Sequence, residues 1–329
     1  MSISSIPGKG NKVNFPSLKS TFVRYGFVVV FVCFFLFFAA WNPVFVQAQN
    51  LTNIFEASSI LLILALGMTL VVATGGIDLS VGIALDFGAA FSVVAMKSYG
   101  MDWWSASMIG IAGGSLVGML NAALVVGLKI SPFLATLSTF FIGSSVQRIF
   151  TNGGGPISYR RMPIEYRNLA QGEIYGIPTE IVIAAVVAII YFIILERSIW
   201  GRQIHAMGMQ RSASIVAGLR VNKLLITCFI AASATCAIAG LLAASNLRMF
   251  TPLAGFAYLL DAIAAVFIGA ALHPRGRPNI PGTVAGVLFL GMVANGLNLM
   301  GLNFNTKDAL SGIILVSALA LAVAQRKMR

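Results

Sequence analysis

Three acidic side chains lie inside or beside long apolar stretches of this 329-residue chain, where a carboxylate can carry an ion or stabilise a helix end. Asp78 follows Gly75 and Gly76 within the stretch Thr-Gly-Gly-Ile-Asp-Leu-Ser-Val-Gly, residues 74–82. Two glycines before an acid should break a membrane helix, and irregular backbone survives there only when it is buried in protein or faces water. Two interpretations remain open. Either Asp78, assisted by Ser80, caps the next helix, or the segment belongs to a pathway through the membrane.

The other two acids point to separate places. Asp86 lies eight residues after Asp78, about 80° away around a helix at 100° per residue, so the two do not obviously form one site. Asp261 comes early in an apolar run, and its depth makes it a functional candidate. Three asparagines also interrupt apolar stretches, and hydrogen bonding between helices is the favoured role for them: Asn121, Asn295 and Asn298.

The chain has no pattern typical of an enzyme. It contains no phosphate-binding loop, no dinucleotide-binding glycine fingerprint and no Cys/His cluster, and its only two histidines are His205 and His273. We therefore expect no catalytic residue, no metal site and no cofactor on this chain.

A polar loop at residues 197–222 contains a short amphipathic pattern. Its apolar positions, which fit one face of a helix ended by Gly208 or Gly218, are Ile204, Met207, Ile215 and Val216. Such a helix either lies in the lipid interface or docks in a groove of a partner. In the second case, the residues presented to the cytosol are Arg202, His205, Met207 and Arg211.

These residues are positioned by membrane helices. Hydrophobic residues make up 58% of the chain and charged residues 10%, and a bilayer core of about 30 Å needs roughly 20 apolar residues per helix. The sequence predicts an all-α polytopic membrane protein with a tail at 1–22 and a single transmembrane domain at 23–329. Ten crossings are expected at 24–41, 55–74, 79–97, 103–127, 132–149, 178–195, 224–245, 255–272, 280–300 and 308–325. The first run also imitates a secretory signal, but it exceeds the usual length of about 7 to 15 residues, so a retained helix is favoured.

The basic residues favour one orientation. With both termini cytoplasmic, the inner side receives fifteen of the 22 Lys and Arg residues, as expected for the inner membrane of a bacterium. The formal charge of +12 is spread among short loops and does not predict nucleic-acid binding. The outer loop at 151–177 breaks the charge rule through Arg160, Arg161 and Arg167.

Several motifs together resemble the permease subunits of ribose-type ABC sugar importers. Residues 74–82 match a hallmark of that family, and the 197–222 loop matches its Gly-Arg-x-Ile-x-Ala-x-Gly pattern. The matching residues in and after this loop are Gly201, Arg202, Ile204, Ala206, Gly208, Ala213, Gly218, Leu219 and Val221. Pro132-Phe133, Ala135-Thr136-Leu137, the run from Asp261 to Ala265 and the run from Asn295 to Leu299 also look like family signatures, so the resemblance covers about residues 23–325.

The resemblance implies a type II importer architecture, similar to the vitamin B12 permease, that works as a pair of identical or different permeases. It implies an ATPase subunit, which binds ATP and Mg, and a periplasmic sugar-binding protein as partners, besides membrane lipid. Contact with the ATPase would rest on Gly201, Arg202, Ile204, His205, Ala206, Gly208, Arg211, Ala213 and Gly218. The pathway or its gate would include Gly75, Gly76, Asp78, Ser80, Asn121, Asp261, Asn295 and Asn298, and the binding protein would dock near Arg160, Arg161 and Arg167.

The chain also departs from the family. His273 to Pro278 replaces a glycine-rich turn, and Met209-Gln210 follows Gly208 where Gly-Asn is usual. The class of substrate, a monosaccharide or related polyol, is therefore a safer expectation than ribose itself. Two alternatives from other classes remain open. One is an ion-coupled secondary transporter in which Asp78, Asp86 or Asp261 carries a proton or sodium ion. The other is a non-transporting membrane scaffold, which would leave the pattern of the 197–222 loop without a purpose.

Overall fold

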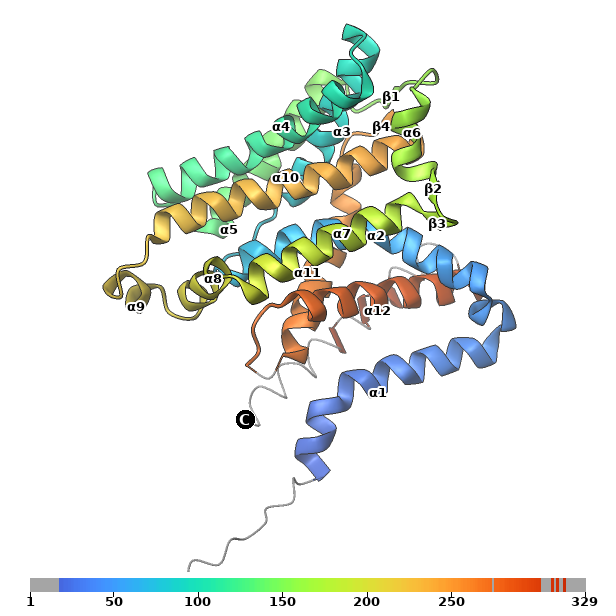
Figure 1. The fold of residues 1–329 in the computed structure, drawn as a ribbon, viewed down its shortest axis with the longest axis vertical. Helices are drawn as coiled ribbons and strands as arrows, with labels where there is room; N and C mark the ends of the chain where they lie inside the picture. Colours follow the sequence, from blue (N-terminus) through green and yellow to red (C-terminus); the bar gives the residue numbers. More distant parts are fainter. Residues whose placement is uncertain (1–17, 274, 303–308, 311, 314–315, 318–329) are drawn as a thin grey trace, which may run out of the picture.

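The described part of the chain is predominantly helical (Figure 1). The computed structural model describes residues 18–273, 275–302, 309–310, 312–313 and 316–317. Its α-helices are α1 (Leu18–Trp41), α2 (Ala48–Ala73), α3 (Val81–Tyr99), α4 (Trp103–Ala122), α5 (Pro132–Phe150), α6 (Ile164–Gln171), α7 (Thr179–Phe192), α8 (Ile199–Met209), α9 (Arg211–Val216), α10 (Val221–Leu247), α11 (Ala254–Leu272) and α12 (Ile280–Leu299). A 3-10 turn, η1 (Pro43–Val46), precedes α2, and π-helical turns extend α4 (η2, Ala123–Gly127) and α7 (η3, Ile193–Arg197).

The predicted all-α polytopic membrane fold is confirmed. Within the described residues, eight helices are long and apolar enough to cross a membrane, and they correspond to the second to ninth predicted crossings. The first predicted crossing coincides with α1, whose segment Gly26–Trp41 is a shorter apolar helix. The tenth, at 308–325, lies mostly outside the described residues. The count of ten and the type II architecture therefore stay predictions.

Close backbone contacts hold the centre of the bundle together. Helix α10 packs along α2, α3 and α4, and several crossings have a glycine where another side chain would strike the neighbouring backbone. A Cβ atom on Gly240 of α10 would collide with the carbonyl oxygen of Leu85 in α3, and one on Gly118 of α4 would collide with that of Phe229 in α10. These glycines let apolar helices approach closely in lipid, where packing rather than the hydrophobic effect drives association.

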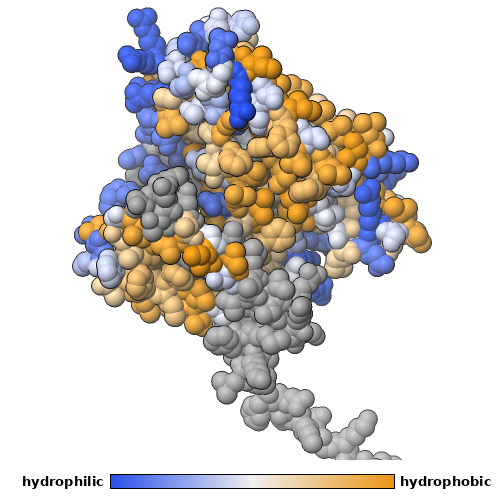
Figure 2. Space-filling model, turned by 180° about the vertical axis from the view of Figure 1, so that it is seen from behind, coloured by the Kyte–Doolittle hydropathy of each residue, from blue (hydrophilic) through white to orange (hydrophobic). Residues whose placement is uncertain are grey.

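The helices run between two polar ends. Figure 1 shows α8 and α9 at one end, and α6 with the four short strands at the other. The strands are β1 (Ile157–Ser158) paired with β4 (Met249–Phe250), and β2 (Glu173–Ile174) paired with β3 (Ile177–Pro178), both antiparallel. The face in Figure 2 is mostly apolar across its middle, and hydrophilic residues gather toward its edges. This pattern fits a bundle embedded in a bilayer.

The 151–177 loop is a folded cap at the α6 end. The buried Tyr166 of α6 shares a 2.8 Å hydrogen bond with Ser92 of α3. The hydroxyl of Ser245 on α10 donates to the carbonyl of Tyr166 and accepts the backbone N–H of Ala170 at 3.1 Å. These contacts attach α6 to the bundle.

The packing predicts unequal effects of adding one methyl group at two helical glycines. Gly240→Ala should lower the melting temperature by several degrees, because overpacking against backbone costs about 1–3 kcal/mol and exceeds the gain in helix propensity of about 1 kcal/mol. Gly127→Ala is the matched control, since a Cβ there meets nothing within 4 Å. Thermal unfolding of the detergent-purified protein measures both. Equal melting temperatures for the two variants would contradict the packing argument.

Candidate functional site

The break between α2 and α3 is a buried polar cluster. Oδ1 of the fully buried Asp78 accepts the backbone N–H of Ser80 at 2.8 Å and the hydroxyl of Ser80 at 2.6 Å. The side-chain amide of Asn121, on α4, donates to the same hydroxyl at 2.6 Å. The structure thus brings together three residues that the sequence suggested for the pathway or gate.

Thr136 on α5 satisfies the irregular backbone of this break. Its hydroxyl oxygen accepts the N–H of Leu79 at 3.1 Å and lies 3.2 Å from the carbonyl of Ile77, to which it can donate. Backbone groups in an apolar bundle need such partners, because an unsatisfied one is costly. Thr136 belongs to a motif noted in the sequence, but its role depends on a contact between segments 57 residues apart, which the sequence pattern does not reveal.

Two acceptor atoms of the cluster have no protein partner among the described residues. They are Oδ2 of Asp78 and Oδ1 of Asn121, and both are buried. A buried acceptor without a donor is unfavourable by about 1–3 kcal/mol. The cluster can therefore accept hydrogen bonds from a hydroxyl-bearing molecule or from water.

The same break touches α8 through backbone alone. A Cβ atom on Gly208 would collide with the carbonyl oxygen of Ala73, the last residue of α2. Gly75 adopts a left-handed φ of +88°, and a Cβ on it would lie 3.3 Å from the Gly208 carbonyl. Gly76 packs against Pro132 at the start of α5. The two sequence motifs, far apart in the chain, meet here.

Helix α8 buries most of the side chains that its sequence suggested would face a partner. The Ser198 hydroxyl caps it by accepting the N–H of Gly201 at 3.1 Å. Arg202 is exposed, with one guanidinium nitrogen 3.3 Å from the carbonyl of Arg197. The prediction that His205 and Met207 face the cytosol is wrong, because both are buried against the bundle, as is Ile204, while Ala206 is half-buried.

Exposed residues follow on α9. Helix α8 ends at Met209 rather than at a glycine, and a second short helix begins at Arg211. Arg211 and Ala213 are exposed, and the exposed Gly218 has a φ of +79°, which directs the chain toward α10.

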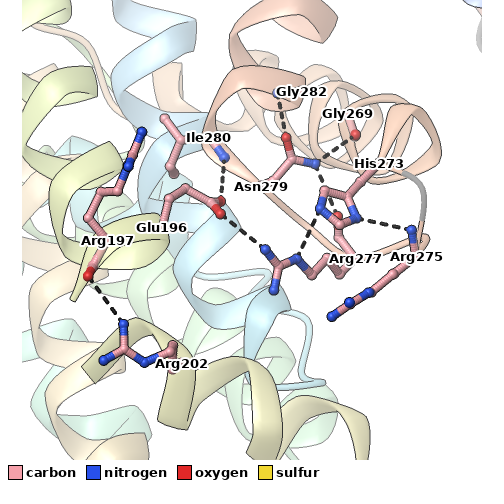
Figure 3. A network of polar contacts seen from close by, with 10 residues as sticks. All are labelled: Glu196, Arg197, Arg202, Gly269, His273, Arg275, Arg277, Asn279, Ile280 and Gly282. Atoms are coloured by element: carbon pink, nitrogen blue, oxygen red, sulfur yellow. Dashed lines mark hydrogen bonds and ion pairs between the residues drawn. The ribbon is translucent and has the colours of Figure 1, made fainter. Parts of the chain in front are cut away.

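An ionic network joins the α8 region to the turn between α11 and α12 (Figure 3). Glu196, in the π-turn that extends α7, pairs with Arg277 at 3.4 Å and accepts the N–H of Ile280 at 3.4 Å. The Nε–H of Arg277 also donates to Nε2 of His273 at 3.1 Å. Asn279 caps α12 by accepting the N–H of Gly282 at 2.8 Å. Arg277, in the segment that departs from the family pattern, is thus bonded to the element that leads into α8.

Burial and nearby positive charge disfavour protonation of His205. Removal from water, followed by the charges of Arg277 and His273, lowers the pKa of His205 to about 4. Its Nε2 atom is buried without a hydrogen-bond partner in the described part of the chain. His205 is therefore neutral at physiological pH, and its side chain packs in the buried face of α8.

Asp86 forms a second polar junction that the sequence did not predict. One carboxylate oxygen accepts the N–H of Gly255 in the first turn of α11 at 2.8 Å, and the other accepts the side-chain amide of Gln147 on α5 at 3.1 Å. The side-chain oxygen Oε1 of the same Gln147 accepts the N–H of Leu253 at 2.8 Å. The carboxylate stabilises the N-terminus of α11 and joins α3 and α5 to it. Asp86 and Asp78 have different partners, in agreement with the sequence analysis.

The remaining predicted pathway residues lie outside the Asp78 cluster. Asn295 on α12 exchanges two 3.0 Å hydrogen bonds with Asn50 on α2, so it joins two helices. Asn298 is exposed near the end of α12. Asp261 is an exposed residue of α11.

The three outer-loop arginines do not share one environment. Arg160 and Arg161 are exposed just after β1, whereas Arg167 is half-buried on α6. The Nε of Arg167 is buried without a partner among the described residues. Within those residues, no group of three or more His, Cys, Asp or Glu side chains is arranged to hold a metal ion.

The electrostatics of His205 predict a pH dependence of stability. Because its pKa falls from about 6.5 in the unfolded chain to about 4 when folded, the unfolded chain binds more protons in this interval. The stability from this residue is present above about pH 7 and is lost as the pH falls toward 4. His205→Gln, which cannot titrate, should show a smaller drop in melting temperature between about pH 7.5 and pH 5 than the natural chain. Identical drops would contradict the burial argument.

Comparisons with known proteins agree with this architecture. A family model described as branched-chain amino acid transport system / permease component matches residues 50–319. The ribose import permease protein of Bacillus subtilis (strain 168) is 33% identical over 280 residues, which cover 85% of this chain and 86% of the relative. The D-allose transport system permease protein of Escherichia coli (strain K12) is 28% identical over 301 residues, 91% of each chain.

A third relative, the fructose import permease protein of Bifidobacterium longum (strain NCC 2705), is 30% identical over 273 residues, 82% of this chain and 76% of the relative. No solved structure matches the chain. The resemblance to import permeases inferred from the sequence motifs is confirmed. Since the family model and the relatives both span most of its length, the chain belongs to this family of transport-system permease components.

Proposed function

We propose that this chain is the translocating subunit of an ATP-binding cassette importer. It passes a monosaccharide, such as a ribose-like pentose, a hexose or a related polyol, across the bacterial inner membrane by alternating access. ATP and Mg bind a separate ATPase subunit, so this chain itself is not an enzyme. The similarity to ribose, D-allose and fructose permeases supports the sugar class without selecting one sugar.

The contact between α8 and the α2–α3 break is the observation that carries this proposal. Gly208 touches Ala73 backbone to backbone, so a displacement of α8 displaces the irregular segment that contains Asp78. An ATPase docked on the exposed side of α8 and on α9 can therefore act on the membrane-embedded break. The loop at 197–222 is the proposed coupling element, with Arg202 and Arg211 exposed for contact.

The same reasoning assigns the other residues. The Asp78, Ser80 and Asn121 cluster, with Gly75 and Gly76, forms a gate beside α8. Asp261, on the exposed face of α11, would face the pathway between two permease copies, identical or different. Asn295 and Asn298 on α12 then support the helices that line it.

The partners follow from the transport class. An ATPase subunit sits at the α8 end, a periplasmic sugar-binding protein docks on the 151–177 loop, and lipid surrounds the apolar band. Both termini are cytoplasmic in this arrangement, with the 1–22 tail preceding the transmembrane domain at 23–329.

Ion-coupled transport is the disfavoured alternative. Both carboxylate oxygens of Asp86 are hydrogen-bonded, one of them to the N-terminus of α11, which suits a structural role better than carriage of an ion. The family relatives also belong to the importer class.

A pull-down tests the coupling assignment. Charge reversal at the two exposed basic residues, Arg202→Glu with Arg211→Glu, should abolish recovery of an ATPase subunit with the tagged permease from detergent-solubilised native membranes, because the docking charges are inverted. Mass spectrometry identifies what is recovered. The matched control is Arg148→Glu, an exposed arginine near the end of α5 and outside the 197–222 loop. Undiminished recovery of the ATPase subunit with the double variant, or no recovery of an ATPase with the natural chain, would contradict the assignment.

Uptake measurements test the docking role of the outer loop. Reversal of Arg160 and Arg161 to Glu should reduce binding-protein-dependent sugar uptake by about tenfold or more, since like charges would then face an acidic partner surface. ATPase recovery in the pull-down should be unchanged, because this loop lies at the opposite end of the bundle. Arg167 is kept for a second variant, because its half-buried side chain adds a folding effect. Intact delivery by both variants would remove these arginines from the interface.

A further inference from the structure

A polar cavity lies at the α6 end of the bundle, away from the Asp78 cluster. Its volume is about 340 Å³, at the small end of the roughly 300–1,000 Å³ range of small-molecule pockets. Four helices contribute to it: α2, α7, α10 and α11. The lining residues are Asn53, Glu56, Ala57, Ile60, Glu180, Asn246 and Tyr258.

The cavity has more hydrogen-bond acceptors than donors. Glu180 is only 1% exposed, and its single hydrogen bond is a long one of 3.3 Å, from the side-chain amide of Asn246 to Oε1. Asn246 is the one described residue that donates a hydrogen bond to this carboxylate. Glu56 adds a second negative charge that acts on Glu180, and none of the described residues that line the cavity is Lys, Arg or His. A ligand here must supply several donors.

The rest of the lining fits a sugar better than a metal ion. Ala57, Ile60 and the ring of Tyr258 give the cavity an apolar wall, which the C–H faces of a sugar can contact and a hydrated ion cannot use. Calcium needs six to eight oxygen ligands, whereas the lining residues that the structure describes supply two carboxylates. The larger cavity of about 480 Å³ is lined mainly by apolar residues such as Phe87, Phe91 and Phe150, so it suits a polyol poorly.

The position of the cavity fits entry from the outer side. Asn246 is fixed by its backbone carbonyl, which accepts the side-chain amide of Gln171 at the end of α6 at 2.9 Å. The cavity therefore lies beside the folded 151–177 cap. Asp261 follows Tyr258 by three residues and so lies on the same side of α11, one turn further along the helix.

We propose that the cavity between α2, α7, α10 and α11 is a low-affinity binding site for one neutral monosaccharide, whose hydroxyl groups donate to Glu56 and Glu180 and whose C–H face lies on Tyr258. The assignment rests on the proposed import function, because it takes the outer side as the entry side. The site receives the sugar after its release from the binding protein and precedes the gate at Asp78.

Saturation-transfer NMR on the purified full-length permease tests the site without any partner. The probes are D-ribose, D-allose and D-fructose, each also measured with added CaCl2. At least one probe should give a transfer signal, which Glu180→Leu should lower by about tenfold, the loss expected for a charge-assisted hydrogen bond. Glu180→Gln keeps an acceptor and should retain most of the signal. Glu173→Leu, an exposed acid at the same end but outside the cavity, is the matched control.

The outcomes separate this site from the proposed function. An absent signal, or a signal in Glu180→Leu equal to that of the natural chain, overturns the site. Loss of the signal in Glu180→Gln, together with displacement of the sugar by calcium, would indicate a cation site and also overturns it. Tyr258→Phe, which retains the ring, and Asn53→Leu repeat the test if Glu180→Leu misfolds. Reconstituted with its ATPase and binding protein, Glu180→Leu should lose sugar uptake while its nucleotide hydrolysis changes less than about twofold. If the natural complex shows no ATP-driven uptake, the import function fails, whatever the binding result.

Discussion

The arrangement depends on one constraint, which is that a polar chain break must be satisfied inside an apolar bundle. Residues 74–80 leave the helical hydrogen-bond pattern between α2 and α3, where neither lipid nor apolar side chains can replace the lost partners. Thr136 bonds the backbone at Leu79, and Asp78 bonds that of Ser80. Helices α4 and α5 are consequently fixed relative to the break, since Asn121 and Thr136 come from them. A change in any one of these helices alters the hydrogen bonds of the others.

Glycines place the backbone of α8 in direct contact with the break. Gly208 lies directly against the end of α2, so no flexible side chain separates the two backbones. Packed interiors transmit displacement because they have little free volume. The ionic network around Glu196 and Arg277 adds a second connection, from the base of α8 to the start of α12. Helix α8 is therefore connected by direct contacts to the break, and the segment that leads into it is connected to α12.

The sequence was sufficient for the fold class because each membrane helix is a local, continuous apolar run. Predicted boundaries for the segments at 103–127 and 132–149 agree closely with α4 plus its π-turn and with α5. The break at Gly75 and Gly76 was also predictable, since glycine and an acid interrupt such a run. The buried face of α8 was not, because the apolar pattern alone does not say whether lipid, a partner or the bundle covers it. His205 was therefore placed on the wrong side.

The acids show most clearly why residue type and depth cannot assign function. Asp78 and Asp86 attracted attention as charges in apolar helices, yet each bonds a backbone N–H beside a helix start, at Ser80 and at Gly255. Glu180 did not stand out in the sequence, because it follows a polar loop. It is nevertheless buried with one weak side-chain partner and a like charge nearby. Asp86 has a donor on each carboxylate oxygen and is already stabilised, whereas Glu180 has a single long hydrogen bond and can take further donors. Only the three-dimensional partners distinguish the two.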